Sequence, residues 1–450
     1  MARNRWARLG VVTVLALLLA GASRAELRIE LVDGRVFVLP FERHEVRRME
    51  FDGVPVDPDG GAVRQEEPVE DVVAAPARLA AEEAKGKGGR LLEVGPGRAF
   101  AAPSAAAAAA RDGDTVEIHP GTYEDVAVWR ANRLTIRGVG GRPRIDARGG
   151  GAQGKAVWVI AGRKVTVENV ELTGSRVPDK NGAGIRAEGG DLTLREVLIH
   201  GNEIGILSAV DFKGELRIER SEFYGNLVPD FEQAGVPPGH NIYVNGARPF
   251  VLIGSWIHGA VDGHNVKTRA SENRILYNRI EDDPGRASSY LIDVAEGAPT
   301  LILGNLLIER AESPNKVILS IASEKNAPTA ATLIAFNTIV RPKNETVAVA
   351  NRGSGPVRLV DNLVVGPGRL AEGNVLVEAT LEVATMAFVD PTRGDWRPAP
   401  GSPAIDAAIP VRPWRKLAIE PRWQYRHPLA LDPRPAAGRG FDLGAFEAGG

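Results

Sequence analysis

The sequence has 450 residues, with 55 lysines and arginines against 57 aspartates and glutamates, which gives a formal net charge of −2. This length can form a large core and more than one domain. A chain without excess positive charge has no general attraction for phosphate backbones, so the composition argues against nucleic acid as a partner. There is no cysteine, which excludes a disulfide framework and leaves packing to stabilise the fold.

Residues 1–25 have the pattern of a secretory signal peptide. Arginines precede an apolar run, which ends in small residues with Ser23 and Ala25 ahead of the cleavage point. The run is too short to span a bilayer, and no later segment is apolar enough to do so. The sequence therefore predicts export to the periplasm or the extracellular space, without membrane insertion once the signal is removed.

Two short regions follow the signal. Residues 26–53 alternate apolar and polar side chains on both sides of Asp33-Gly34, which predicts a small β-hairpin unit. Residues 54–90 are rich in Pro, Gly, Ala, Glu and Lys and poor in large apolar residues, which predicts a flexible linker.

Residues 91–367 contain a self-similar unit of short apolar strands broken by Gly and Asn, as in RKVTVENVELTG, ENRILYNRIED and PTLILGNLLIER. Aligning the apolar positions puts Asn278, Asn305, Asn337 and Asn362 in one column, at intervals of 27, 32 and 25 residues. Repeats of this length without helical periodicity predict an all-β solenoid of about nine coils with parallel strands. A β-sandwich is the alternative, but sandwiches do not repeat one motif at a nearly fixed period.

The ends of this region resemble a known family. The segment LLEVGPGRAFAAPSAAAAAARDGDTVEIHPGTYEDV is similar to the N-terminal cap and first coil of right-handed parallel β-helix proteins of the pectate-lyase-like superfamily, which have PbH1-type repeats. The resemblance implies a short capping helix in the Ala-rich stretch at 103–114. GDWRPAPGSPAIDAA and GFDLGAFE resemble the closing segments of secreted members, so residues 368–450 are expected to close the solenoid. The superfamily contains lyases, hydrolases, epimerases, adhesins and noncatalytic proteins.

Strand alternation predicts which side chains face outward in the middle of the solenoid. In HNIYVNG, inward Ile242 and Val244 leave Asn241, Tyr243 and Asn245 outside. One coil later, an inward Val266 leaves Asn265, Lys267 and Arg269 outside, and one coil further an inward Ile292 puts Asp293 beside Lys267. The outward column is predicted to be Arg186, Leu207, Tyr243, Lys267, Asp293 and Ser320.

The residue types in this patch suit β-elimination on a uronate polymer. That reaction needs a base for the proton next to the carboxylate, a cation for the developing charge and an acid for the leaving oxygen. Lys267 or Tyr243 could be base or acid, and Arg269 could pair with a carboxylate through two hydrogen bonds. The candidate catalytic residues are Lys267, Arg269, Tyr243, His264 and Asp293, and the candidate substrate-binding residues are Asn241, Asn245, Asn265 and Arg186.

A second resemblance concerns the same place. VKTRASENRILYN resembles the Lys-Ser…Asn segment of β-helix lyases that cleave alginate or chondroitin-type glycans, in which the lysine is the base. On that match Lys267 carries over, Thr268 replaces the serine and Asn273 matches the asparagine. Those lyases place an arginine acid on the next coil, where this chain has Asp293. Their pair of calcium-binding glutamates before the lysine has no counterpart here except Asp262.

Several alternatives stay open at this point. A glycoside hydrolase would need paired carboxylates, and the candidates are Asp262, Asp293, Glu296, Asp282 and Asp283. Lys267 and Asp293 could instead form an exposed ion pair between coils. His240 and His264, one coil apart and with His258 nearby, could form an internal ladder, or could bind a metal with Asp262, although their spacing has no metal signature.

The function predicted from the sequence is that of an exported protein that binds a polysaccharide, and could cleave it as a lyase, in a groove around residues 240–296. The alternatives are a noncatalytic structural or adhesive protein of the envelope or surface, and a glycoside hydrolase. Calcium is left open as a cofactor, and a monomer is expected.

Overall fold

The structure is a computed structural model that describes residues 89–313, 315–324 and 329–449, together with strands within residues 12–56. The chain divides into two units, residues 1–66 and 67–450. In the first unit, β1, β2 and β3 form an antiparallel sheet in that order, and β4 pairs with β5. The bounds are β1 Val12–Leu17, β2 Arg24–Leu31, β3 Val36–Glu42, β4 Met49–Phe51 and β5 Val54–Val56.

The first unit bears on the predictions for the N-terminal region in two ways. β2 and β3 pair across the Asp33-Gly34 stretch, with Leu27 opposite Leu39. β1 falls inside residues 1–25 and pairs with β2. Signal-peptide cleavage and export stay predictions, and residues 57–88 of the predicted linker lie outside the described residues.

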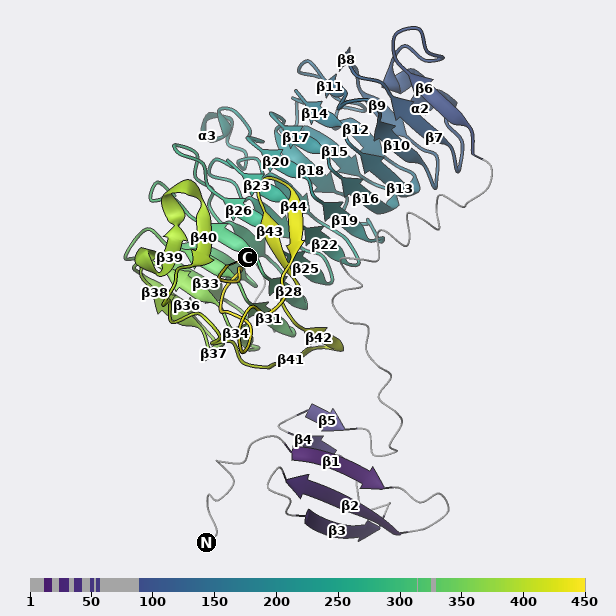
Figure 1. The fold of residues 1–450 in the computed structure, drawn as a ribbon. Coiled ribbons are helices and arrows are strands. Elements are labelled where there is room, and N and C mark those ends of the chain that lie inside the picture. The colour runs from purple at the N-terminus through teal and green to yellow at the C-terminus, as the bar shows by residue number, and fades with distance from the viewer. Residues whose placement is uncertain are drawn as a thin grey trace. The chain divides into compact units, whose positions relative to one another are not determined.

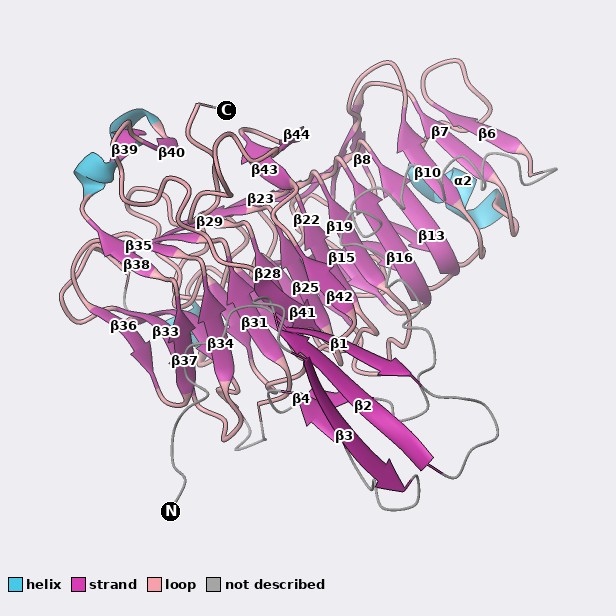
Figure 2. Ribbon diagram, turned by 60° about the horizontal axis from the view of Figure 1, so that its bottom comes forward, coloured by secondary structure: helices cyan, strands magenta, loops and turns pink. Residues whose placement is uncertain are grey.

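The second unit contains three long parallel sheets, which Figures 1 and 2 show as rows of side-by-side strands. The twelve-stranded sheet contains β6 Leu91–Val94, β7 Thr115–Ile118, β10 Thr135–Gly138, β13 Arg163–Glu168, β16 Gly190–Arg195, β19 Leu216–Glu219, β22 Phe250–Ile253, β25 Asn273–Leu276, β28 Thr300–Leu303, β31 Thr332–Ala335, β34 Val357–Val360 and β37 Val375–Glu378. The eleven-stranded sheet contains β8 Thr122–Glu124, β11 Arg144–Asp146, β14 Glu171–Thr173, β17 Leu198–His200, β20 Glu222–Tyr224, β23 Trp256–His258, β26 Arg279–Glu281, β29 Leu306–Ile308, β32 Thr338–Val340, β35 Leu363–Val365 and β38 Leu381–Val383. The ten-stranded sheet contains β9 Ala127–Trp129, β12 Ala156–Ile160, β15 Ala183–Ala187, β18 Ile204–Ser208, β21 Ile242–Val244, β24 Val266–Thr268, β27 Ile292–Val294, β30 Val317–Ile321, β33 Val347–Asn351 and β36 Arg369–Glu372.

Each coil gives one strand to each sheet, and each strand pairs in parallel with its counterpart in the next coil. The predicted parallel β-helix is therefore confirmed. The interior is a stack of apolar side chains because inward positions repeat from coil to coil. In the ten-stranded sheet the fully buried residues in register are Ile206, Ile242, Val266, Ile292 and Leu319.

The predicted asparagine column is a hydrogen-bonded ladder at the turn between the twelve-stranded and eleven-stranded sheets. The side-chain amide of Asn278 donates to Asn305 Oδ1, Asn305 donates to Asn337, and Asn337 donates to Asn362, each over 2.9 Å. All four side chains are fully buried. The ladder satisfies polar groups that the tight turns would otherwise leave unpaired inside the protein.

Helices are short in the described part of the chain (Figure 2). The predicted capping helix is α2, Pro103–Ala109, which begins at a proline and buries Ala106 and Ala107 against β6 and β9. α3, Phe231–Ala234, lies in a turn between coils, and two 3-10 helices are η2, Thr385–Ala387, and η3, Pro391–Arg393. No helix in the described residues is long and apolar enough to cross a membrane.

The C-terminal segment forms three antiparallel strand pairs that pack on the outside of the later coils. The pairs are β39 Phe388–Asp390 with β40 Asp395–Pro398, β41 Val411–Trp414 with β42 Leu417–Ile419, and β43 Trp423–Arg426 with β44 Ala430–Pro433. Trp414 packs over Leu301 and Leu333 of the twelve-stranded sheet. Trp396 packs over Leu306 of the eleven-stranded sheet. The apolar outer faces of these coils are thus covered.

Candidate functional site

The outward column predicted on the ten-stranded sheet is present in the register of the strands. Tyr243 in β21 lies opposite Leu207 on one side and Lys267 on the other. Lys267 in β24 lies opposite Asp293, which lies opposite Ser320. The register was therefore predicted correctly, although Leu207, Asp293 and Ser320 are buried and not outward as expected.

Lys267 makes its ion pair with a residue that the sequence did not indicate. Its Nζ lies 2.7 Å from Oε1 of Glu324, which follows β30. The alternative in which Lys267 and Asp293 form an exposed ion pair is wrong, because Asp293 is buried. Asp293 is only 1% exposed and accepts a 2.7 Å hydrogen bond from the hydroxyl of Ser323. Burial raises the pKa of Asp293, although the Ser323 bond and the charge of Lys267 oppose the rise.

Arg269 binds the same carboxylate with two nitrogens. Its Nε and Nη2 lie 2.6 and 2.8 Å from the two oxygens of Glu324. Its Nη1 donates to Asn245 Oδ1 over 2.5 Å and to the Tyr243 hydroxyl. Burial acts to raise the pKa of Glu324, but the hydrogen bonds from Arg269 and Lys267 outweigh it and bring the pKa to about 2. Lys267 and Arg269 thus form a preassembled pair of cations that holds one carboxylate.

The two histidines of the predicted site lie at its edge, in the turns before β21 and β24. The rings of His240 and His264 stack at 4.8 Å, and the backbone N–H of His264 donates to His240 Nδ1 over 2.9 Å. His264 also contacts the ring of Tyr290 at 4.8 Å. Burial lowers the pKa of both histidines, with Lys267 adding to the effect, and brings that of His264 to about 3. Both rings are neutral at physiological pH.

Two of the predicted substrate-binding residues are misplaced by the sequence analysis. Asn241 and Asn265 are fully buried, not outward. They belong to a second ladder, in which Asn202, Asn226, Asn241 and Asn265 are joined by side-chain hydrogen bonds of 2.8–3.1 Å. The alternation fails there because these asparagines lie in turns, ahead of the strands.

Arg186 is separated from the patch by the buried Leu207, which lies between it and Tyr243 in the column. Its guanidinium donates to Asn181 over 3.3 Å. Asn245 contacts a candidate catalytic residue through its side chain, which accepts from Arg269.

The alternatives based on acidic residues can be compared with the positions of those residues. Asp282 is buried and accepts hydrogen bonds from the backbone N–H and hydroxyl of Ser288, and burial raises its pKa to about 6. Asp283 pairs with His258. Within the described residues, no three or more His, Asp or Glu side chains are grouped closely enough to hold a metal ion, so Asp262, His240 and His264 do not form such a group.

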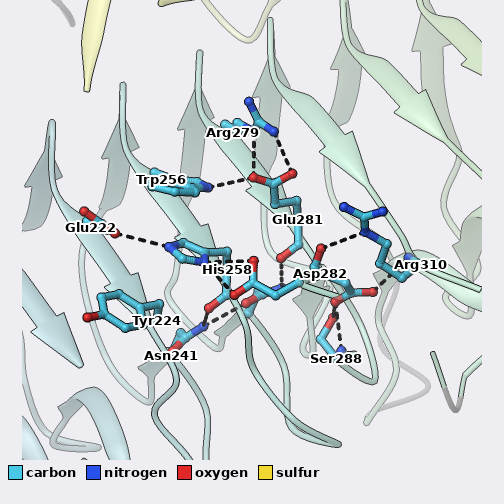
Figure 3. Close-up of polar contacts among 12 residues, drawn as sticks. Glu222, Tyr224, Asn241, Trp256, His258, Arg279, Glu281, Asp282, Ser288 and Arg310 are labelled. Atoms are coloured by element: carbon cyan, nitrogen blue, oxygen red, sulfur yellow. Dashed lines mark hydrogen bonds and ion pairs between the residues drawn. The ribbon is translucent and has the colours of Figure 1, made fainter. Parts of the chain in front are cut away.

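A second polar cluster, which the sequence analysis missed, lies on the outer face of the eleven-stranded sheet (Figure 3). His258 Nδ1 lies 2.9 Å from Asp283 and its Nε2 lies 3.2 Å from Glu222. Burial opposes protonation, but these two carboxylates prevail and raise the pKa of His258. The ring stacks on Tyr224 at 5.1 Å and on Trp256 at 3.9 Å.

The next coil continues this cluster. The indole N–H of Trp256 donates to Glu281 over 2.8 Å, and Arg279 binds the same carboxylate through Nε and Nη2 at 2.7 and 2.9 Å (Figure 3). Trp256 lies opposite Arg279 in register, just as His258 lies opposite Glu281. The strand alternation that placed Lys267 could also have been applied to the segments EFYG, WIHG and NRIED, and it would have indicated this cluster. These residues pair with one another, so the cluster joins successive coils.

Three stacked parallel sheets, an N-terminal helix and an ordered C-terminal segment define the class as parallel β-helix proteins. Among solved structures, that of pectate lyase Pel9A is similar with a TM-score of 0.55 and 14% identity, over 81% of this chain and 98% of that chain. An alginate lyase from Paenibacillus sp. str. FPU-7 has a TM-score of 0.46 and 14% identity, over 64% of this chain and 99% of that one. The A-module of the mannuronan C-5 epimerase AlgE6 of Azotobacter vinelandii has a TM-score of 0.43 and 17% identity, over 72% of this chain and 97% of that one.

The similarity to the pectate lyase structure supports the fold that the sequence predicted. At sequence identities this low, a shared fold does not show that two proteins catalyse the same reaction, because proteins with many different activities have the same fold. No family model matches the chain, and no curated protein matches it.

Proposed function

We propose that this protein binds an acidic polysaccharide across Tyr243, Lys267 and Arg269 on the ten-stranded sheet and cleaves it by β-elimination. The observation that supports the proposal is the carboxylate of Glu324, which Lys267 and Arg269 hold at 2.6–2.8 Å. A uronate residue has the same carboxylate group. The extended face of a solenoid suits a linear polymer, and solved structures of this fold include a pectate lyase.

In this proposal the substrate carboxylate displaces Glu324 and pairs with Arg269 through two hydrogen bonds. When Glu324 is released, the ammonium of Lys267 gives its proton to solvent, and the resulting amine takes the proton from the carbon next to the carboxylate. The electron pair of that C–H bond forms a carbon–carbon double bond, and the bond to the glycosidic oxygen breaks. The Tyr243 hydroxyl, which Arg269 holds in place, gives its proton to the leaving oxygen.

Arg269 has two effects in this scheme. It neutralises the substrate carboxylate, which makes the neighbouring proton more acidic, and it holds the Tyr243 hydroxyl by a hydrogen bond from Nη1. Asp293 lies beside Lys267 on the next strand, where it is buried and fixed by Ser323, so it does not face a substrate. The neutral rings of His240 and His264 form the adjoining wall.

The test is ultraviolet absorbance of the unsaturated product, measured with pectate, alginate and glycosaminoglycans, with and without calcium. The wild type should form product, and Lys267→Ala should form none while it retains its melting temperature. Lys155→Ala is the matched control, since Lys155 also forms an exposed ion pair between coils, at 2.6 Å from Glu188. Binding without product in the wild type would favour the noncatalytic alternative, and equal activity in Lys267→Ala would refute the proposed base.

A further inference from the structure

A pocket of about 330 Å³ lies where the C-terminal segment meets the eleven-stranded sheet. Arg279 of β26 and Leu306 of β29 contribute to it from the sheet, and residues 393–397 and 424–427 contribute from the C-terminal segment. It therefore lies on a different sheet from Lys267 and Arg269. Its volume is at the lower end of the range for small-ligand sites, about 300–1,000 Å³.

The pocket exists because the outer face of this sheet changes character between two coils. β26 presents Arg279 and Glu281, which pair with each other, whereas β29 presents Leu306 and Ile308. The C-terminal segment packs on the apolar coils, where Phe388 covers them. The polar coil beside this covered region is left open, and the C-terminal segment forms a wall next to it.

The walls carry more cationic groups than acidic partners can neutralise. Arg397 pairs with Asp395 at 2.7 Å, and Arg426 pairs with Asp432 at 2.9 Å. Arg393 is exposed, and among the described residues no carboxylate lies within ion-pair distance of its guanidinium, while the carboxylate of Asp390 accepts its backbone N–H over 3.2 Å. One guanidinium at the pocket is therefore available for an anion from outside.

A tryptophan and a histidine in the wall add aromatic rings. Trp396 is 7% exposed, and its indole N–H has no hydrogen-bond acceptor within the described part of the protein. The nitrogen is buried and not open to the pocket, so the indole is a reporter of events in the pocket wall and not a donor to a ligand. His427, which lies edge-on to Trp256 at 4.4 Å, adds an aromatic surface that a sugar ring can contact.

We infer that this pocket is a second glycan-binding site, which holds an anionic substituent of a saccharide, a carboxylate or a sulfate, through Arg393, beside the indole of Trp396. The inference does not depend on catalysis at Lys267. Arginine suits both anions because its planar fork can donate two parallel hydrogen bonds to either. A polymer anchored here would be held on the protein away from the proposed cleavage site.

The test uses the full chain with its tryptophan indoles labelled with ¹⁵N, and Trp396→Phe assigns the Trp396 signal. The probes are a galacturonate trisaccharide, a sulfated chondroitin tetrasaccharide and neutral cellotriose. We expect the Trp396 signal to move with one or both anionic probes and not with cellotriose. A shift caused by the galacturonate probe indicates carboxylate recognition, and a shift caused only by the sulfated probe indicates sulfate recognition.

Arg393→Gln should weaken this binding by about fivefold or more, as expected from the loss of a charged hydrogen-bond donor. Arg133→Gln is the matched control, an arginine 62% exposed on an early coil. Lys267→Ala should leave the Trp396 response unchanged, which separates this site from the proposed cleavage site. The inference would be overturned if the Trp396 signal did not shift with any of the three probes, or if it shifted equally in Arg393→Gln and in the wild type.

Discussion

Arg269 and Glu324 are 55 residues apart in the sequence and form a two-point ion pair with N–O distances of 2.6 and 2.8 Å. The contact reaches across coils, since Arg269 follows β24 whereas Glu324 follows β30, and β27 lies between these strands. Glu324 thus provides the negative charge that balances Lys267 and Arg269, and it does so from the turn after β30. The same contact means that an acidic ligand must compete with a residue of the protein.

Glu324→Gln should therefore strengthen binding of an acidic oligosaccharide. Partly exposed ion pairs contribute about 0.2–1 kcal/mol, so removing the competitor should lower the Kd by up to about fivefold. Titration calorimetry with an oligogalacturonate or oligoalginate measures the change. Glu372→Gln is the control, because Glu372 also pairs with an arginine, Arg352, at 2.8 Å outside the site. Weaker binding in Glu324→Gln would show that Glu324 assists the ligand.

Asn305→Ala should destabilise the solenoid without altering its exposed surface. Asn305 is fully buried, and its amide donates to Asn337 and to the carbonyls of Ile275 and Leu303. Each buried group left unpaired costs about 1–3 kcal/mol, and the free energy of unfolding should fall by at least that amount. Urea denaturation measures it. Asn374→Ala, at an exposed asparagine, should be nearly neutral, and equal losses in the two variants would contradict a structural role for the ladder.

Glu309 should make stability depend on pH. Its side chain is 3% exposed, and burial raises its pKa from 4.5 to about 7 despite a hydrogen bond from Thr346. A raised carboxyl pKa means that the folded state retains a proton that the unfolded state releases. The stabilisation from this retained proton is complete below about pH 4.5 and is lost as the pH rises through 7. The free energy of unfolding should change by an amount on the order of 3 kcal/mol.

Glu309→Gln tests this pH dependence because the amide keeps the shape and cannot ionise. Urea denaturation of both proteins at pH 5 and pH 8 gives the comparison. The wild type should lose more stability than Glu309→Gln between these values, because the substitution removes both the ionisation of Glu309 and its repulsion with Asp282. Parallel pH profiles would show that Glu309 ionises normally in the folded protein.

Trp414→Ala should loosen the C-terminal segment from the coils beneath it. Trp414 is 4% exposed, packs over the twelve-stranded sheet and donates from its indole N–H to the carbonyl of Ala331 over 2.8 Å. Removing a buried aromatic side chain costs about 3–5 kcal/mol. Proteolysis and calorimetry should detect the loss as early release of this segment. Met386→Ala is the control, since Met386 is 87% exposed in the same segment.

The sequence was sufficient to predict the repetitive part of the molecule, because the repeat period shows which residues lie side by side in successive coils. Asn278 and Asn305 recur one coil apart, and so do Tyr243 and Lys267, so their neighbours in space follow from the period and the strand alternation. The same logic fails at turns, which have no two-residue alternation. Asn241 was therefore expected outside and is buried in a ladder.

The sequence alone determined the solenoid, its inward stack, the asparagine column and the outward position of Lys267, because each depends on a local period. Only the tertiary structure decided that Glu324 neutralises Lys267 and Arg269, and that the C-terminal segment leaves Arg393 and Trp396 beside a pocket. Those contacts join segments whose separation follows no period, so they depend on turn conformation and on how the closing strands pack.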